Sequence, residues 1–197
     1  MAEIKQPMKK PGAFTDPFAK KGGMGGGPEK KRQKAASEYK KSLQEKQTLK
    51  RLYGLSEKQF KRYVTESLDM MGRVSNVSDE LVKRLEKRLD NVVFRLGFAK
   101  TRAMARQMVS HAYFKVNGKP VNIPSYQVQK DDVVSLKETK KKKGVFVELP
   151  AGLKKMEAPL WLKMDKEKLE AKTIGEPSLA EVNLPVEISL IFEFYSR

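Results

Sequence analysis

The sequence contains no cysteine and only one histidine, His111. Without thiols there is no disulfide, no thiolate nucleophile and no zinc site built on cysteine. A single histidine also excludes a multi-histidine metal site, so we expect no metal centre and no cofactor. Nothing arranges Ser, Asp or Glu as a catalytic triad or a paired acid. These absences predict a protein without catalytic residues, and therefore not an enzyme.

Long apolar runs are also missing. No stretch approaches the roughly 18 residues that a membrane-spanning helix needs. No apolar segment at the N-terminus resembles a secretion signal. We therefore expect a cytoplasmic protein that does not bind a membrane.

Positive charge is what the sequence has in excess. Its 197 residues include 41 Lys and Arg against 24 Asp and Glu, a formal net charge of +17. This excess predicts a polyanionic partner, because each phosphate that Lys or Arg neutralises releases counterions and strengthens binding. The alternative is a lysine-rich surface without a ligand. Residues 1–50 carry 13 basic and 5 acidic side chains, whereas residues 158–197 carry 5 and 7. We therefore expect RNA to contact the front and middle of the chain.

Residues 1–34 are rich in glycine and proline and end in a basic run. Such a segment buries too little apolar area to offset its ordering entropy, so it is predicted to be disordered without RNA. The basic run consists of Lys30, Lys31, Arg32 and Lys34. Because it directly precedes a predicted helix, we favour an RNA contact over an inert tail.

Helical spacing of apolar residues continues from residue 37 to residue 111. The predicted helices are 37–53, ended by Gly54; 56–71, opened by a Ser56–Gln59 capping box; 78–96, opened by Ser78; and 101–111, opened by Thr101. The last of these places Arg102 and Arg106 on one face.

After Ala112 the apolar period becomes that of strands. The dipeptide Asn117-Gly118 predicts a hairpin turn. The expected strands are 113–116, 119–122, a short one at Tyr126 and Val128, 133–136, and 160–164 around Trp161. Residues 185–195 form an apolar helix or strand that we expect to dock against the front helices.

These elements predict an α+β fold. A mostly helical domain is completed by the C-terminal segment, and a module of two helices plus a small antiparallel sheet is inserted between its parts. The expected boundaries are 1–34 for the basic extension, 35–89 for the first part of the helical domain, 90–150 for the module and its basic connector, and 151–197 for the C-terminal segment.

Basic residues cluster around the predicted start of the helix at Thr101. A helix N-terminus has free N–H groups that bind anions, and arginine forks bind phosphate oxygens. Recognition of this kind reads the shape and backbone of RNA. The alternative is a charged solvent-exposed face. The predicted RNA-binding residues are Arg84, Arg88, Arg95, Lys100, Thr101, Arg102, Arg106, His111, Lys115, Asn117 and Lys119, together with Lys30, Lys31, Arg32 and Lys34.

Three blocks of sequence resemble one known family. The stretch RLDNVVFRLGFAKTRAMARQMVSHAYFKVNGKPVNIPSYQVQKDDVVSL, residues 88–136, resembles the RNA-binding module named after the fourth protein of the small ribosomal subunit. LQEKQTLKRLYGLSEKQF at 43–60 resembles that family's helical domain, and EFYSR at 193–197 resembles its C-terminus. Because the blocks occur in the same order, the chain is similar to the family over about residues 35–197.

The resemblance implies a structural protein of the small ribosomal subunit. It implies a primary rRNA binder that nucleates folding of the subunit body at a multi-helix junction of the 5′ domain. It also implies small-subunit ribosomal protein five as a neighbour, with an influence on decoding accuracy, and places Lys30–Lys34 near the channel where mRNA enters. Residues 1–29 lack the four cysteines of zinc-binding members and the surrounding pattern, so the family's contacts there are not carried over.

Two other functions fit parts of the sequence. Pseudouridine synthases that carry the module use an aspartate in an Arg-Leu-Asp motif, which Arg88-Leu89-Asp90 matches. Here the motif continues into a helix, so we expect Asp90 to cap or pair with a local arginine instead. A free-standing RNA-binding factor would need the module but not the blocks at 43–60 and 193–197.

Overall fold

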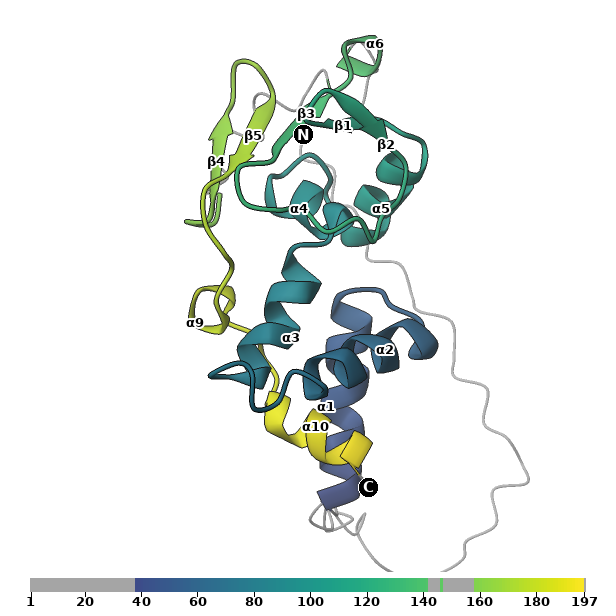
Figure 1. Ribbon diagram of the computed structural model, residues 1–197. Helices are drawn as coiled ribbons and strands as arrows, with labels where there is room; N and C mark the ends of the chain where they lie inside the picture. Colours follow the sequence, from purple (N-terminus) through teal and green to yellow (C-terminus); the bar gives the residue numbers. More distant parts are fainter. Residues whose placement is uncertain (1–37, 142–145, 147–157, 197) are drawn as a thin grey trace, which may run out of the picture. The chain divides into compact units, whose positions relative to one another are not determined.

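The computed structural model describes residues 38–141, 146 and 158–196, and Figure 1 shows their arrangement. The predicted extension 1–34 and its basic run lie outside the described residues. Two hydrophobic cores organise the described part, one among helices and one beneath a sheet. The α+β prediction is confirmed.

The first core belongs to a helical domain. Its helices are α1 (Glu38–Leu52), α2 (Glu57–Leu68), α3 (Val77–Glu86), α9 (Leu179–Val182) and α10 (Ile188–Ser196). Leu49, Phe60 and Leu81 are fully buried here together with Ile191 of α10. The expected docking of the C-terminal run is confirmed, since α10 lies along α1 (Figure 1).

The predicted boundary between the first two helices is also confirmed. Gly54 has a φ of +61°, the left-handed conformation that glycine adopts without strain at a helix end. Ser56 then accepts a hydrogen bond from the Gln59 backbone N–H, and the Gln59 side chain accepts one from Ser56 N–H. This capping box satisfies donors that α2 leaves unpaired at its start.

The predicted helix 78–96 is wrong in two respects. Its start is capped by Asn76, whose side chain accepts from the Ser78 N–H, so α3 begins at Val77. It is also interrupted after Glu86, because Arg88 takes an extended conformation and pairs with Gln127 in an isolated bridge. A second helix, α4 (Leu89–Arg95), then begins. Apolar spacing continues through the break, so the periodicity did not reveal it.

The second core lies beneath the sheet of the module. Helices α4 and α5 (Arg102–Ser110) pack against β1 (Phe114–Val116), β2 (Lys119–Val121) and β3 (Val133–Leu136). Asn117 and Gly118 have φ values of 49° and 78°, so the predicted hairpin turn is confirmed. The short strand expected at Tyr126 and Val128 does not form; its backbone instead bonds to Lys87 and Leu89.

Two further strands extend this sheet. β4 (Leu162–Asp165) and β5 (Glu170–Thr173) form a hairpin, and β5 pairs with β3 in the order β2-β1-β3-β5-β4. β5 was not predicted, because its sequence EAKT has little strand character. Within the expected segment 151–197, these two strands belong to the sheet, whereas α9 and α10 pack on the helical domain. A short helix, α6 (Glu138–Lys141), follows β3.

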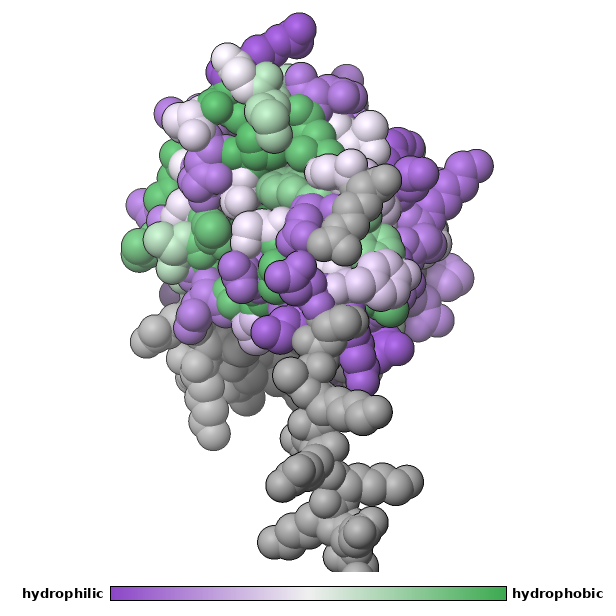
Figure 2. Space-filling view, turned by 90° about the horizontal axis from the view of Figure 1, so that it is seen from below, coloured by the Kyte–Doolittle hydropathy of each residue, from purple (hydrophilic) through white to green (hydrophobic). Residues whose placement is uncertain are grey.

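The surface of the described residues is mainly polar. Figure 2 shows the face seen from below in Figure 1, where hydrophobic residues gather in one region among hydrophilic ones. Few large apolar side chains are exposed: Tyr39, Met71, Ile123, Leu160 and Ile174. None of the described helices is long and apolar enough to cross a bilayer.

Candidate nucleic-acid interface

The candidate interface is built around the start of α5. Thr101 takes an extended conformation and its side chain accepts a hydrogen bond from the Met104 N–H, which fixes where the helix begins. Arg102 and Arg106 follow at helical spacing of four, and Ala105 and Val109 bury the opposite side. The predicted cap and the shared face of the two arginines are therefore confirmed.

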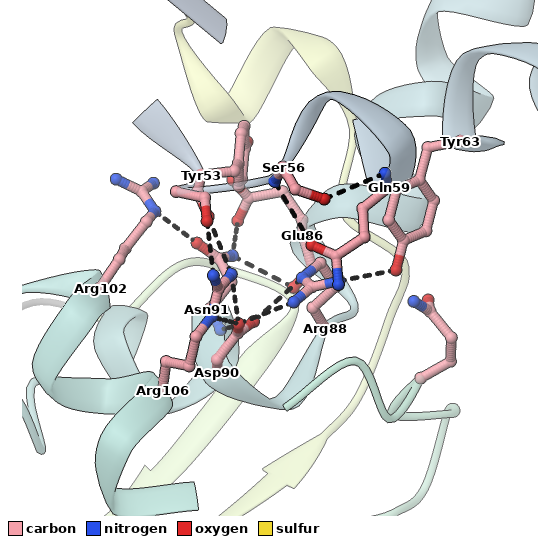
Figure 3. Close-up of polar contacts among 12 residues, drawn as sticks. Tyr53, Ser56, Gln59, Tyr63, Glu86, Arg88, Asp90, Asn91, Arg102 and Arg106 are labelled. Atoms are coloured by element: carbon pink, nitrogen blue, oxygen red, sulfur yellow. Dashed lines mark hydrogen bonds and ion pairs between the residues drawn. The ribbon is translucent and has the colours of Figure 1, made fainter. Parts of the chain in front are cut away.

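Arg106 links α5 to the helical domain. Its Nε lies 3.0 Å from Asp90 Oδ2, and its terminal nitrogens donate to the backbone carbonyls of Tyr53 and Gly54. Asp90 also accepts two bonds from Arg88, at 3.1 and 2.8 Å, and Arg88 donates to the Tyr63 hydroxyl. Figure 3 shows these contacts. Asp90 thus pairs with local arginines, as expected.

Glu86 is the second anion of the cluster and is fully buried at the end of α3. Arg95 binds it with two hydrogen bonds of 2.9 and 2.8 Å. The Tyr53 hydroxyl donates to Oε1 at 2.5 Å and the Asn91 amide donates to Oε2 at 2.7 Å. Burial and the neighbouring Glu86 carboxylate raise the pKa of Tyr53, which keeps the phenol protonated. Burial opposes the charge of Arg95, but its bonds to Glu86 outweigh this and raise its pKa.

Arg102 differs from the other arginines of the cluster because none of the described carboxylates bonds to it. Its Nε donates to Asn91 Oδ1 at 2.8 Å, and its guanidinium stacks on the rings of Tyr53 and Phe94 at 4.9 and 4.5 Å from their centroids. Burial, and to a lesser degree the charge of Arg95, lowers its pKa. Within the described part of the chain, its two terminal nitrogens make no hydrogen bond, and in Figure 3 they point away from the cluster.

The cluster has an excess of positive charge. It contains four arginines and two carboxylates, and the carboxylates are bonded by Arg88, Arg95 and Arg106. The remaining positive charge lies at Arg102, which is half-buried, beside the first N–H groups of α5. A guanidinium with unfilled donors next to a helix N-terminus is suited to bind an anion.

The other predicted residues are spread over the module: Lys100 and Thr101 precede α5, His111 ends it, Lys115 lies on β1 and Lys119 on β2. Lys100, Thr101, His111 and Lys119 are exposed, and Lys115 is half-buried on the outer face of β1. The three lysines have no ion-pair partner among the described residues. Asn117, in contrast, uses its amide internally, donating to Asp132 at 2.7 Å and accepting from the Val133 N–H at 2.9 Å. Its role here is to hold the hairpin.

The basic residues of α3 and of the segment after it, up to Arg95, are paired with protein groups. Arg84 pairs with Glu80 and Glu66 at 2.8 Å each, and Lys87 pairs with Glu176 at 2.7 Å. Arg88 is 2% exposed, so its guanidinium is enclosed by protein groups. Arg95 keeps a quarter of its side chain exposed but is occupied by Glu86. The structure therefore separates enclosed arginines from those at the surface, which the sequence pattern did not.

Four residues of the cluster were missed from the sequence: Tyr53, Tyr63, Glu86 and Asn91. Only Glu86 carried a signal. It follows the buried Val82 by four residues, so a carboxylate lies on the apolar face of α3. A charged residue on such a face is rarely buried unless it is paired.

No catalytic constellation appears in the described residues. Groups of three or more His, Cys, Asp or Glu that could hold a metal ion do not occur there. Asp90, the aspartate of the Arg-Leu-Asp sequence, is 4% exposed and accepts bonds from Arg88, Arg106 and the Asn91 N–H. A carboxylate so enclosed is not available as a nucleophile for a flipped base.

Comparison with known proteins shows two family matches along the chain. Residues 87–134 match the model of the S4 domain, and residues 4–87 match the Ribosomal protein S4/S9 N-terminal domain. The second match includes residues 4–29, where the sequence alone showed no family pattern. The small ribosomal subunit protein uS4 of Caldicellulosiruptor saccharolyticus is 47% identical over 165 residues, which cover 83% of this chain and 77% of the relative.

Similar relatives occur in other bacteria. The uS4 proteins of Persephonella marina and Chromobacterium violaceum are 46% and 44% identical over 161 residues, covering 81% and 82% of this chain and 77% of each relative. Identity at this level over both the helical domain and the module extends well beyond the module alone. The chain therefore belongs to the family of the small ribosomal subunit protein uS4.

Proposed function

We propose that this chain is a structural constituent of the small ribosomal subunit, that it binds the subunit's rRNA, and that it has no enzymatic activity. The observation that carries the proposal is the half-buried Arg102 beside the exposed Lys100 at the start of α5, in a chain of this family. There Arg102 presents unfilled donors next to a helix N-terminus, and exposed Lys100 lies beside it in the sequence. The location that follows is the cytoplasm.

We propose that the surface residues of this interface contact RNA phosphates. These are Lys100, Thr101, Arg102, His111, Lys115 and Lys119. Arg88, Arg95 and Arg106 support them from within, Asn117 holds the hairpin, and Arg84 lies at the margin. Contacts to phosphate position a protein on RNA without reading base identity. Such an interface suits a folded rRNA junction, whose shape is specific.

We assign the chain finer roles on the basis of its family. It is a primary binder that nucleates assembly of the subunit body at the 5′-domain junction and supports translational accuracy. Its protein neighbour is small-subunit ribosomal protein five. Lys30, Lys31, Arg32 and Lys34 lie near the channel where mRNA enters. Cross-linking within purified small subunits tests both neighbours, and recovery of neither would contradict these assignments.

The principal test is binding to a transcript of the 5′ domain of the organism's own small-subunit rRNA. We expect the protein to bind this transcript more tightly than a duplex RNA of arbitrary sequence. Replacing Lys100 and Lys119 with Ala should lower the slope of log K against log salt concentration by about 0.7–0.9 for each phosphate that is no longer neutralised. Lys58→Ala on α2, with an equal change in charge per site, is the control. Equal affinity for both RNAs would contradict the proposal.

A free-standing RNA-binding factor is distinguished by sedimentation. A ribosomal protein remains with the small subunit after a high-salt wash. Recovery only in the soluble fraction would favour the factor. The family match across residues 4–134, and not only the module, supports the ribosomal protein.

A further inference from the structure

We propose that Glu86 is a positioning residue for RNA binding: through Asn91 it holds the Arg102 guanidinium in the orientation that receives an RNA phosphate. Glu86 contacts no solvent, and this role rests on the proposed rRNA binding at Arg102. The path runs from Glu86 Oε2 to the Asn91 amide at 2.7 Å and from Asn91 Oδ1 to Arg102 Nε at 2.8 Å (Figure 3).

The Glu86 carboxylate determines which way the Asn91 amide is turned. An ionised carboxylate only accepts hydrogen bonds, so Asn91 must turn its NH2 group toward Glu86. The Asn91 NH2 also donates to the Glu86 backbone carbonyl at 3.2 Å, which holds the amide in the same sense. Asn91 Oδ1 therefore faces Arg102 and accepts from its Nε. A glutamine at residue 86 could donate as well as accept, so its side chain would no longer enforce this orientation, and only the weaker bond to the backbone carbonyl would remain.

Glu86 also neutralises Arg95, whose positive charge acts against that of Arg102. Arg95 donates two hydrogen bonds to Glu86. Without that carboxylate, the Arg95 charge would repel Arg102. Glu86 thus keeps a second guanidinium from displacing Arg102 from the Tyr53 and Phe94 rings.

The result is an arginine held ready before RNA arrives. Its Nε is occupied, its guanidinium carbon lies over two rings, and its terminal nitrogens point outward. A side chain fixed in its binding geometry loses less conformational entropy on association than a flexible one. Tyr53, which donates to the same carboxylate, belongs to the helical domain, so this domain contributes to an interface on α5.

The experiment compares Glu86→Gln with Glu66→Gln in the full chain. Both replacements remove one negative charge, and Glu66 is an exposed partner of Arg62 and Arg84. Bulk electrostatics predicts that both variants bind the 5′-domain transcript as tightly as the wild type or more tightly. If Glu86 positions Arg102, Glu86→Gln should instead lower the affinity for the transcript about tenfold. This is the size expected for one charge-assisted hydrogen bond.

A double-mutant cycle with Arg102→Ala separates positioning from a general effect on folding. Arg102→Ala should weaken binding about tenfold. In that background Glu86→Gln should change the affinity by less than about twofold, because the group that Glu86 positions is absent. Circular dichroism at the binding temperature verifies that each variant is folded. If Glu86→Gln is not, Asn91→Ala replaces it with the same expectation, since Glu86 then keeps Arg95 and Tyr53.

Three outcomes would overturn the inference. These are tighter binding by Glu86→Gln, losses of Glu86→Gln and Arg102→Ala that add fully, and wild-type affinity of Asn91→Ala. The proposed function fails by a different result, namely that the wild-type chain does not prefer the 5′-domain transcript.

Discussion

At the scale of single residues, the arginines of this chain differ in role because their surroundings differ. Arg88 is enclosed with Asp90, whose side chain is 5% exposed, whereas the partners of Arg102 among the described residues are an amide oxygen and two aromatic rings. An enclosed ion pair contributes little net stability as a unit. Removing one partner is costly, because it leaves the other charge buried without compensation.

Replacing Asp90 with Ala is therefore expected to lower the free energy of unfolding by about 3–5 kcal/mol, because Arg88 would keep its charge in a buried site. Urea unfolding followed by the fluorescence of Trp161, which is buried in the sheet core, measures this change. Asp131→Asn removes the charge that pairs with Lys172 in an exposed ion pair, and asparagine tolerates the left-handed φ of 69° at this position, so the midpoint should not change measurably. Equal midpoints for both variants would show that Asp90 does not compensate Arg88.

At the scale of the elements, the helix boundaries follow from local hydrogen bonds. The Asn76 side chain accepts from the Ser78 N–H at 2.9 Å, and this bond places the start of α3. The sequence offered Ser78 as an equally suitable cap, because serine and asparagine have similar preferences for that position. The backbone conformation decides between them, since Asn76 is extended and Ser78 is already helical.

Asn76→Ala should accordingly destabilise the protein by about 1 kcal/mol, the usual value of a helix cap, because an N–H donor of α3 loses its acceptor. Ser78→Ala should change stability by less than about 0.5 kcal/mol, as is common for surface substitutions. Chemical denaturation of the two variants under identical conditions compares them directly. A larger loss for Ser78→Ala would restore the boundary predicted from the sequence.

At the scale of the whole described unit, ion pairs join segments that are distant in sequence. Glu57 accepts from Lys46 at 2.7 Å and from the Tyr195 hydroxyl at 2.8 Å, which ties α10 to α1 and α2. Glu176 pairs with Lys83 and Lys87 of the α3 region. Burial alone would raise the pKa of Glu57, but its hydrogen bonds outweigh this and lower it to about 2. Bonds from Lys87 and Lys83 lower the pKa of Glu176 to about 2.

These two carboxylates predict an acid dependence of stability. Because their pKa is lower in the folded protein than the ordinary value of 4.5, their contribution is complete above pH 4.5. It is lost as the pH falls from 4.5 toward 2. Urea midpoints measured across this window should fall less steeply in Glu57→Gln/Glu176→Gln than in the wild type. Both side chains are about half exposed, so added salt should reduce the difference. Parallel curves would show that neither ion pair contributes.

The sequence by itself determined the features that depend on near neighbours. The capping box at Ser56, the glycine end of α1, the Asn117-Gly118 turn and the helix start at Thr101 all follow from interactions within a few residues. The net charge indicated a polyanion, and the three matching blocks indicated the family. These signals are local or compositional, so they can be read without a fold.

Tertiary structure alone decided the features in which distant segments meet. The break after Glu86 forms because Gln127 and Val128 bond to the chain there, and β5 forms because β3 and β4 flank it. Which arginines remain available for RNA also depends on the fold. Tyr53, Glu86 and Asn91 meet only when α1, α3 and α4 pack together. The buried Glu86 carboxylate then accepts hydrogen bonds from the other two side chains. Residue type predicted a cationic surface, but the enclosure of Arg88 and the exposure of the Arg102 donors came from packing.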